Sequence, residues 1–264
     1  MENEAGARSL IIGVYDLMQE PTYAGRDLLS LPDVLGDNVK LNPGATRYTR
    51  QYQFTPYYNI DIWQAAYRQI VSLNEALYYL GKLDETASIK ALKGEALFLR
   101  AYDYFYLASI YGRMPGHLVE GFDLCVPLIT EPFFNNGGSI SDQASVARNK
   151  VDEVWAQIVK DLNDSFEYLN GNDSGNFPNR ASAIAAKALL SRVYLYMGKW
   201  NECVTASSYV LTNASVKIYS GDKYTSVFSS GSESIWQLKY DNTENLLSSS
   251  LHSVYGTRDD GYRD

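Results

Sequence analysis

The residues best suited to chemistry lie between positions 37 and 59, where aromatic and polar side chains alternate. They are Asp37, Asn38, Arg47, Tyr48, Tyr52, Phe54, Tyr57, Tyr58 and Asn59. Aromatic faces beside carboxylate, amide and guanidinium groups can stack on a sugar ring and hydrogen-bond its hydroxyls. The chain has 22 tyrosines against 9 phenylalanines, and tyrosine joins an apolar face to a polar rim. This stretch is therefore a candidate ligand surface. The alternative is a loop that its own aromatic residues pin to the protein.

Residues that could catalyse a reaction are few. Only His117 and His252 could act as general bases near neutral pH, and neither has a carboxylate or nucleophile at a recognisable spacing. Motifs of zinc proteases, serine hydrolases and phosphate-binding loops are missing from the sequence. Two distant carboxylates could still hydrolyse a glycoside, and Asp37, Asp61 and Glu95 are candidates. We predict a protein that is not an enzyme and needs no cofactor, with a glycoside hydrolase as the less favoured alternative.

Charge and metal-ligand patterns exclude further classes. The net charge of -8 and the lack of basic clusters argue against nucleic acid as a ligand. The segment 171–179 resembles a calcium loop, but Ala181 stands where the closing carboxylate belongs, so we predict no metal site. Cys125 and Cys203 have no metal-ligand spacing, and we expect Cys203 to be a buried free thiol. No apolar run approaches the roughly 20 residues that span a bilayer.

Hydrophobic periodicity predicts six helices, at about residues 4–19, 60–81, 86–112, 147–170, 181–197 and 200–212. The helix at 86–112 is the most apolar, and small and large residues alternate on one of its faces, which predicts close neighbours on two sides. Asn74 interrupts an apolar face, and we expect a buried amide that ties helices together rather than a ligand contact. We expect Glu95 and Arg100 to form a buried ion pair or a cap.

The remaining segments read as long loops. Residues 21–59 carry several prolines and are expected to be irregular, residues 116–142 form a second loop with a possible short strand at 126–129, and residues 216–264 are expected to be irregular with short extended pieces. Residues 185–211 approximate a tetratricopeptide pattern through Leu190, Tyr194, Gly198, Cys203 and Leu211. We therefore predict a mostly α fold, a tetratricopeptide-like array of helical hairpins with long irregular loops and a few short strands, in a single domain 1–264.

One segment resembles a known family. Residues 94–115, GEALFLRAYDYFYLASIYGRMP, are similar to a signature segment of the SusD/RagB family, the SusD-like outer-membrane lipoproteins of nutrient uptake. Three other phrases resemble the same family: Gly13-Val14-Tyr15, residues 31–41 (LPDVLGDNVKL), and the aromatic, tyrosine, isoleucine and asparagine spacing that ends at Asn74. The resemblance covers most of the chain.

This resemblance implies a function. SusD-like proteins of starch utilisation systems bind oligosaccharide or polysaccharide at the cell surface without cleaving it, and deliver it to a partner TonB-dependent (SusC-like) transporter. The resemblance places one wall of the glycan site before Trp63, with Tyr48, Tyr57 and Tyr58 as stacking faces and Asp37, Arg47 and Asn59 as polar contacts.

The resemblance also implies a location. It predicts a surface-exposed protein of the outer membrane, lipid-anchored in its full-length precursor, of which this chain is the N-terminal helical portion without export signal or lipid-bearing cysteine. The alternative function is a tetratricopeptide-like module that binds another protein through its hairpins and has no affinity for sugars.

Overall fold

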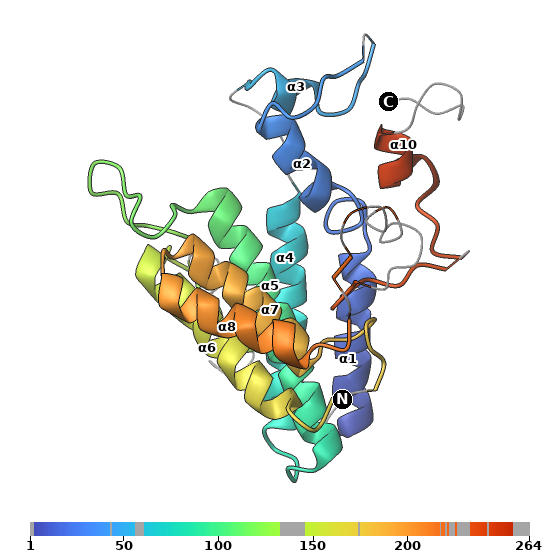
Figure 1. Cartoon of the computed structure of the whole chain (residues 1–264), viewed down its shortest axis with the longest axis vertical. Coiled ribbons are helices and arrows are strands. Elements are labelled where there is room, and N and C mark those ends of the chain that lie inside the picture. Colours follow the sequence, from blue (N-terminus) through green and yellow to red (C-terminus); the bar gives the residue numbers. More distant parts are fainter. Residues whose placement is uncertain are drawn as a thin grey trace. The chain divides into compact units, whose positions relative to one another are not determined.

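The structure is a computed structural model that describes residues 3–42, 44–55, 61–132, 146–173, 175–216, 218–219, 221, 225, 233–241 and 243–255. Its helices are α1 (Glu4–Met18), α2 (Asp27–Leu35), α3 (Thr49–Tyr52), α4 (Ile62–Leu80), α5 (Ala87–Tyr111), α6 (Val151–Leu169), α7 (Ala183–Tyr196), α8 (Trp200–Asn213) and α10 (Leu251–Tyr255), with a 3₁₀ turn, η4 (Leu247–Ser249) (Figure 1). The predicted mostly α fold is confirmed. The expected short strands are reduced, within these ranges, to the isolated bridges Val119–Phe122 and Leu124–Lys150.

All of the six predicted helices are present, with ends shifted by a few residues. Local capping explains the observed starts. The Thr86 hydroxyl accepts a hydrogen bond from the Ile89 amide at 3.2 Å, which fixes the start of α5. Helix α6 begins later than predicted, because the Glu153 carboxylate accepts the Lys150 amide at 3.0 Å and so closes the first turn there.

The stretch 21–59 differs from the prediction, because it contains helices α2 and α3. Pro32 lies inside α2 and cannot supply an amide to the preceding turn, which is why the sequence favoured a loop. Burial of Leu28, Leu31 and Val34 on one side of α2 offsets that lost hydrogen bond. Tertiary packing therefore overrides the local signal of the proline.

The chain divides into two compact units. Unit 1 comprises Met1–Ile12 and Gln69–Gln237, and unit 2 comprises Gly13–Arg68 and Leu238–Asp264. Each unit is formed by segments far apart in the chain, and the single domain 1–264 stays a prediction.

Unit 1 is organised around α5. Helix α5 packs on α6, α6 on α7 and α7 on α8, which is the consecutive stacking of a helical-hairpin array (Figure 1). Gly94 lets α5 and α6 approach closely, since a Cβ atom at this position would lie 2.5 Å from the Cγ atom of Leu169. At the same crossing the Ser165 hydroxyl donates to the Gly94 carbonyl at 2.7 Å. At Gly94, the small residue thus allows the close approach of a neighbouring helix that the sequence pattern predicts.

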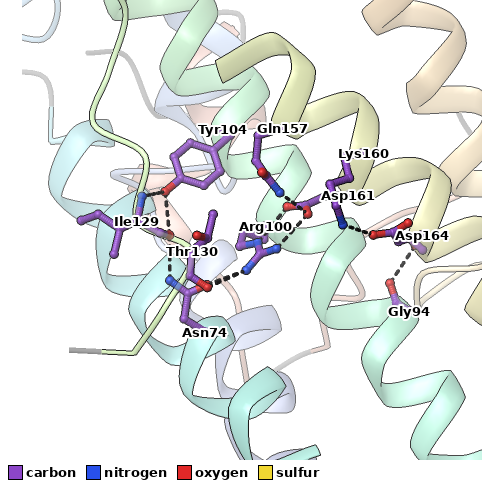
Figure 2. Close-up of polar contacts among 11 residues, drawn as sticks. Asn74, Gly94, Arg100, Tyr104, Ile129, Thr130, Gln157, Lys160, Asp161 and Asp164 are labelled. Atoms are coloured by element: carbon purple, nitrogen blue, oxygen red, sulfur yellow. Dashed lines mark hydrogen bonds and ion pairs between the residues drawn. The ribbon is translucent and has the colours of Figure 1, made fainter. Parts of the chain in front are cut away.

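A buried polar network crosses this array. Arg100 of α5 binds Asp161 of α6 through two parallel hydrogen bonds of 2.8 Å, and its third nitrogen donates to the Asn74 side-chain oxygen at 2.8 Å (Figure 2). Glu95, one turn earlier, pairs with Arg180 at 2.5 Å. Both residues thus form buried ion pairs, but with Arg180 and Asp161 and not with each other. Asn74 is the buried amide that the sequence predicts, 1% exposed.

The same network holds the loop that follows α5. Asn74 and the Tyr104 hydroxyl both donate to the Ile129 carbonyl, at 2.7 and 2.9 Å, and the Ile129 amide donates to the Tyr104 oxygen at 2.7 Å (Figure 2). The strand expected at 126–129 is therefore an extended segment whose main chain is bound by side chains. At its start, the Cys125 amide donates to the Asn149 carbonyl at 2.7 Å, and the Asn149 amide donates to the Val126 carbonyl at 3.2 Å.

Candidate functional site

The candidate site belongs to unit 2 and starts at the end of α2. Gly36 follows the last helical residue, and Asp37 adopts a left-handed backbone with φ of 57°, a conformation that aspartate tolerates. The Asn38 amide donates to the Asp33 carbonyl at 3.0 Å, which closes this turn. The turn leaves Asp37 and Asn38 exposed, so both side chains are available to a ligand.

Tyr48 lies in a buried polar cluster against α2. Its hydroxyl donates to the Asp27 carboxylate at 2.6 Å and lies 2.7 Å from the Ser30 hydroxyl. The Arg26 guanidinium donates to the same carboxylate at 2.6 Å and to the Tyr48 oxygen at 3.0 Å. Burial, followed by the hydrogen bond to Asp27, raises the pKa of Tyr48 to about 12. The phenol is therefore a neutral anchor that holds residues 45–52 on α2.

The anchor determines how much of Tyr48 a ligand could reach. The residue is 9% exposed and has a φ of 60°. This placement matches the alternative interpretation, in which an aromatic residue pins the loop. A stacking role for Tyr48 stays a prediction. Tyr57, Tyr58 and Asn59, the other predicted contacts before Trp63, lie outside the described residues.

Arg47 connects this anchored turn with the C-terminal segment of unit 2. It is half-buried, and its Nη1 atom donates to the Ser248 carbonyl, in η4, at 3.4 Å. The two residues are 201 positions apart in the chain. Because Tyr48 fixes the backbone beside it, Arg47 is held with its guanidinium near η4.

Tyr255 is a candidate site residue that the sequence analysis did not name. Its hydroxyl donates to the Asp33 carboxylate at 3.0 Å, and 46% of the residue is exposed. Burial of the hydroxyl end, together with that hydrogen bond, raises the pKa of Tyr255 to about 12. The second Asp33 oxygen accepts from the Asn38 side chain at 3.4 Å. Asp33 therefore joins the Asp37 turn to α10 and fixes an exposed aromatic ring beside it.

The resulting arrangement suits a neutral polar ligand. Within unit 2 it combines an exposed ring with a fixed hydroxyl, the exposed side chains of Asp37 and Asn38, and a half-buried guanidinium at Arg47. Elsewhere in unit 2, the Phe54 ring is 58% exposed and its backbone has a φ of 51°. Several non-glycine residues with positive φ lie in this region, and such strained positions often accompany binding loops. The surface can stack on a ring and hydrogen-bond hydroxyls with little reordering.

The described residues contain little that would support other chemistry. They hold no group of histidine, cysteine and acidic side chains that could bind a metal ion. Of the acids considered for glycoside hydrolysis, Glu95 is 1% exposed and ion-paired, so it is poorly placed for proton transfer to a ligand. Cys125 and Cys203 are free thiols, but Cys203 is half-buried, not buried as the sequence predicts. None of the helices in the described ranges is long and apolar enough to cross a membrane.

Comparisons with known proteins agree on one family. The model of a SusD-like family described as "Starch-binding associating with outer membrane" matches residues 9–195. The SusD-like protein P2 of Formosa agariphila is 24% identical over 217 residues, which are 79% of this chain and 39% of that protein.

Solved structures are similar as well. A putative sugar binding protein from Bacteroides vulgatus has a TM-score of 0.82 at 26% identity, over 96% of this chain and 58% of its own. A laminarin binding SusD-like protein has a TM-score of 0.70 at 26% identity, over 88% of this chain and 50% of its own. This chain thus spans less than two thirds of the length of each of these relatives.

Proposed function

Because the chain belongs to the SusD-like family of starch-binding proteins that associate with the outer membrane, we propose that it captures an oligosaccharide or polysaccharide at the cell surface. In this proposal the glycan is not cleaved and passes to a partner TonB-dependent, SusC-like transporter. Surface exposure through a lipid anchor in the full-length precursor belongs to the same proposal. The family is one of carbohydrate-binding proteins, while the transporter, the anchor and the absence of catalysis are inferences for this chain.

One structural observation carries the proposal: Tyr255 presents an exposed ring whose hydroxyl is fixed by Asp33, next to the Asp37–Asn38 turn. A ring that is already held in one orientation loses little entropy when a sugar stacks on it. The neighbouring Asp37 carboxylate can accept hydrogen bonds from equatorial hydroxyls, and the Asn38 amide can both donate to them and accept from them. This combination of a rigid apolar face with a polar rim is what a pyranose ring needs.

We assign roles to the residues on this basis. Tyr255 is the stacking face in the described part of unit 2, Asp37 and Arg47 are polar contacts, and Tyr48 positions Arg47 through its bond to Asp27. Tyr57, Tyr58 and Asn59 remain proposed contacts from the sequence. Glucans are the first ligands to test, because the matched family is described as starch-binding and one structural relative as laminarin-binding.

The test is a titration of the chain with starch and laminarin oligosaccharides by isothermal calorimetry. Tyr255→Ala should weaken glucan binding about threefold to tenfold, since aromatic stacking contributes roughly 0.5–1.5 kcal/mol. Tyr255→Phe keeps the ring and should retain most of the affinity. Tyr240→Ala is the matched control: it also removes a partly exposed tyrosine of unit 2, 39% exposed, which instead donates to the Gln19 carbonyl.

Each outcome has a distinct meaning. Saturable binding that Tyr255→Ala weakens and Tyr240→Ala does not would support both the function and the site. Equal binding by all variants would refute the site but keep the function. Binding of no glucan and no other polysaccharide would refute the function and favour the protein-binding module. Release of reducing ends from a bound glycan would instead identify a hydrolase.

A further inference from the structure

The turn that ends α6 brings an asparagine and a glycine together. Asn170 is the C-cap residue of α6, and Gly171 follows it with a left-handed backbone, φ of 79°. Both residues are exposed. The peptide nitrogen of the residue after an asparagine can attack the asparagine side-chain amide, and glycine hinders this attack least because it has no side chain. The pair is therefore a candidate for chemical modification.

Hydrogen bonds do not hold the two groups that would react. Within the described part of the chain, neither the Asn170 side-chain amide nor the Gly171 peptide nitrogen takes part in a hydrogen bond. The bonds of Asn170 use its main chain instead. Its peptide nitrogen donates to the Phe166 carbonyl at 2.9 Å, and its carbonyl accepts from the Asn172 side chain at 3.4 Å. The Cγ atom and the attacking nitrogen can therefore approach each other without losing a partner of their own.

Asn213 shows the opposite situation at the end of α8. It is also exposed, and it is the last residue of its helix. Its side-chain nitrogen donates to the Tyr209 carbonyl at 2.8 Å, and the Ala214 peptide nitrogen donates to the Val210 carbonyl at 2.9 Å. Both groups that would have to react are thus engaged, so two hydrogen bonds must break before this position reacts.

We propose that Asn170 is a deamidation site of the folded protein. The Gly171 peptide nitrogen loses its proton to solvent base and forms a bond to the Asn170 Cγ atom. The side-chain nitrogen leaves as ammonia, and a five-membered succinimide remains. Water then opens this ring at either carbonyl, so one water is consumed, one ammonia is released, and the product is aspartate or isoaspartate. The backbone must first rotate about the Asn170 Cα–C bond, because its ψ of 107° turns the nitrogen away from Cγ.

The modification changes the end of α6 in two ways. Either product places a carboxylate at the C-terminus of the helix, where the helix dipole disfavours negative charge. Isoaspartate also lengthens the main chain by one carbon atom. Asn172, just beyond that point, donates its peptide nitrogen to the Leu169 carbonyl at 3.0 Å and its side chain to the Tyr168 carbonyl at 3.1 Å. The longer chain displaces both donors, so the last turn of α6 loses two partners of its carbonyl groups.

Peptide mapping of the aged, folded chain tests the proposal. After incubation at pH 7.4 in oxygen-18 water, trypsin cleavage at Lys160 and Arg180 gives a peptide, residues 161–180, that contains five asparagines, so Asn170 is compared with four others in one molecule. The label in the new carboxylate identifies hydrolysis that occurred during ageing. Asn170 should lose its amide at least tenfold faster than Asn213, and faster still at higher pH, because the deprotonated nitrogen attacks. Equal rates at Asn170 and Asn213 would overturn the proposal.

The variant Ala214→Gly separates the effect of structure from that of sequence. In this variant Asn213 also precedes a glycine, but both groups that would react keep their hydrogen bonds. In the folded variant Asn170 should still react at least fivefold faster than Asn213. In concentrated urea the two rates should agree within about twofold, because unfolding releases every one of these groups. Equal rates in the folded variant would overturn the role assigned to the unbonded groups.

Hydrogen exchange tests the effect on α6. In the purified isoaspartate form, the Asn172 amide should exchange at least tenfold faster than in the fresh chain, because it has lost the Leu169 carbonyl. Asn170→Gln is the control, since its longer side chain would need a six-membered ring and should resist the same incubation. Unchanged exchange at Asn172 in the isoaspartate form, or equal acceleration in aged Asn170→Gln, would overturn this effect.

Discussion

Replacing Arg100 by methionine should destabilise unit 1 by about 3–5 kcal/mol, because it leaves a buried carboxylate without its cation. The side chains of Arg100 and Asp161 are 7% and 0% exposed, and two hydrogen bonds of 2.8 Å join them. In the variant, Asp161 keeps just the Gln157 amide at 2.8 Å, and the Asn74 oxygen loses its donor. Urea unfolding followed by circular dichroism measures the change in free energy.

Two control variants accompany Arg100→Met. Lys160→Met removes an exposed ion pair of the same helix, between Lys160, which precedes Asp161, and Asp164; the two side chains are 65% and 41% exposed. Solvent screens such a pair, so this change should cost less than about 1 kcal/mol. The double variant Arg100→Met with Asp161→Leu removes both buried charges and should recover most of the lost stability. An equal loss of unfolding free energy in Arg100→Met and Lys160→Met would contradict the assigned role of the buried pair. So would a double variant that is no more stable than Arg100→Met.

Further predictions concern glycine, pH and the loop after α5. Gly94→Ala should destabilise by about 1–3 kcal/mol through its clash with Leu169, whereas Gly13→Ala in α1, with nothing within 4 Å of the new methyl group, should stabilise by roughly 0.5–1 kcal/mol; urea midpoints compare the two. Tyr48 has a folded-state pKa of about 12, above its ordinary 10.0. The unfolded chain therefore loses this proton first, so the contribution is complete below pH 10.0 and is lost as pH rises towards 12. The stability advantage of the native chain over Tyr48→Phe should shrink across that window, and an advantage that stays constant would contradict the assignment. Tyr104→Phe removes the group that both accepts from the Ile129 amide and donates to its carbonyl, so hydrogen exchange at Ile129 should accelerate at least tenfold while the α5 amides stay protected.

The sequence was most informative about the long helices. Periodic apolar faces are a local feature, so they locate α5 and α7 to within a few residues, and the caps that fix the observed starts are Thr86 and Ser182. Helix α2 was missed because Pro32 gives a strong local signal against a helix, while the burial that stabilises α2 depends on residues that no local pattern connects.

The candidate site rests partly on the sequence. Asp37 and Arg47 could be proposed because their residue types match a binding loop; both belong to unit 2, and their role stays a prediction. Tyr255 could not be found this way, because its partner Asp33 is 222 positions away and the short α10 has no periodicity to reveal it. The buried anchor of Tyr48 was also beyond the sequence, since no local pattern connects Tyr48 with Arg26 and Asp27, which lie more than 20 positions earlier.

The way Ile129 is held has a consequence for how this segment tolerates change. Asn74 and Tyr104 bind the amide and carbonyl of Ile129, and Arg100 donates to the Thr130 carbonyl at 3.3 Å, so each contact goes to the main chain. These hydrogen bonds therefore do not depend on which side chains residues 129 and 130 carry. A substitution at position 129 therefore leaves these main-chain contacts in place, with proline as the exception because it lacks the amide hydrogen. The segment is free to drift in sequence while its path stays fixed.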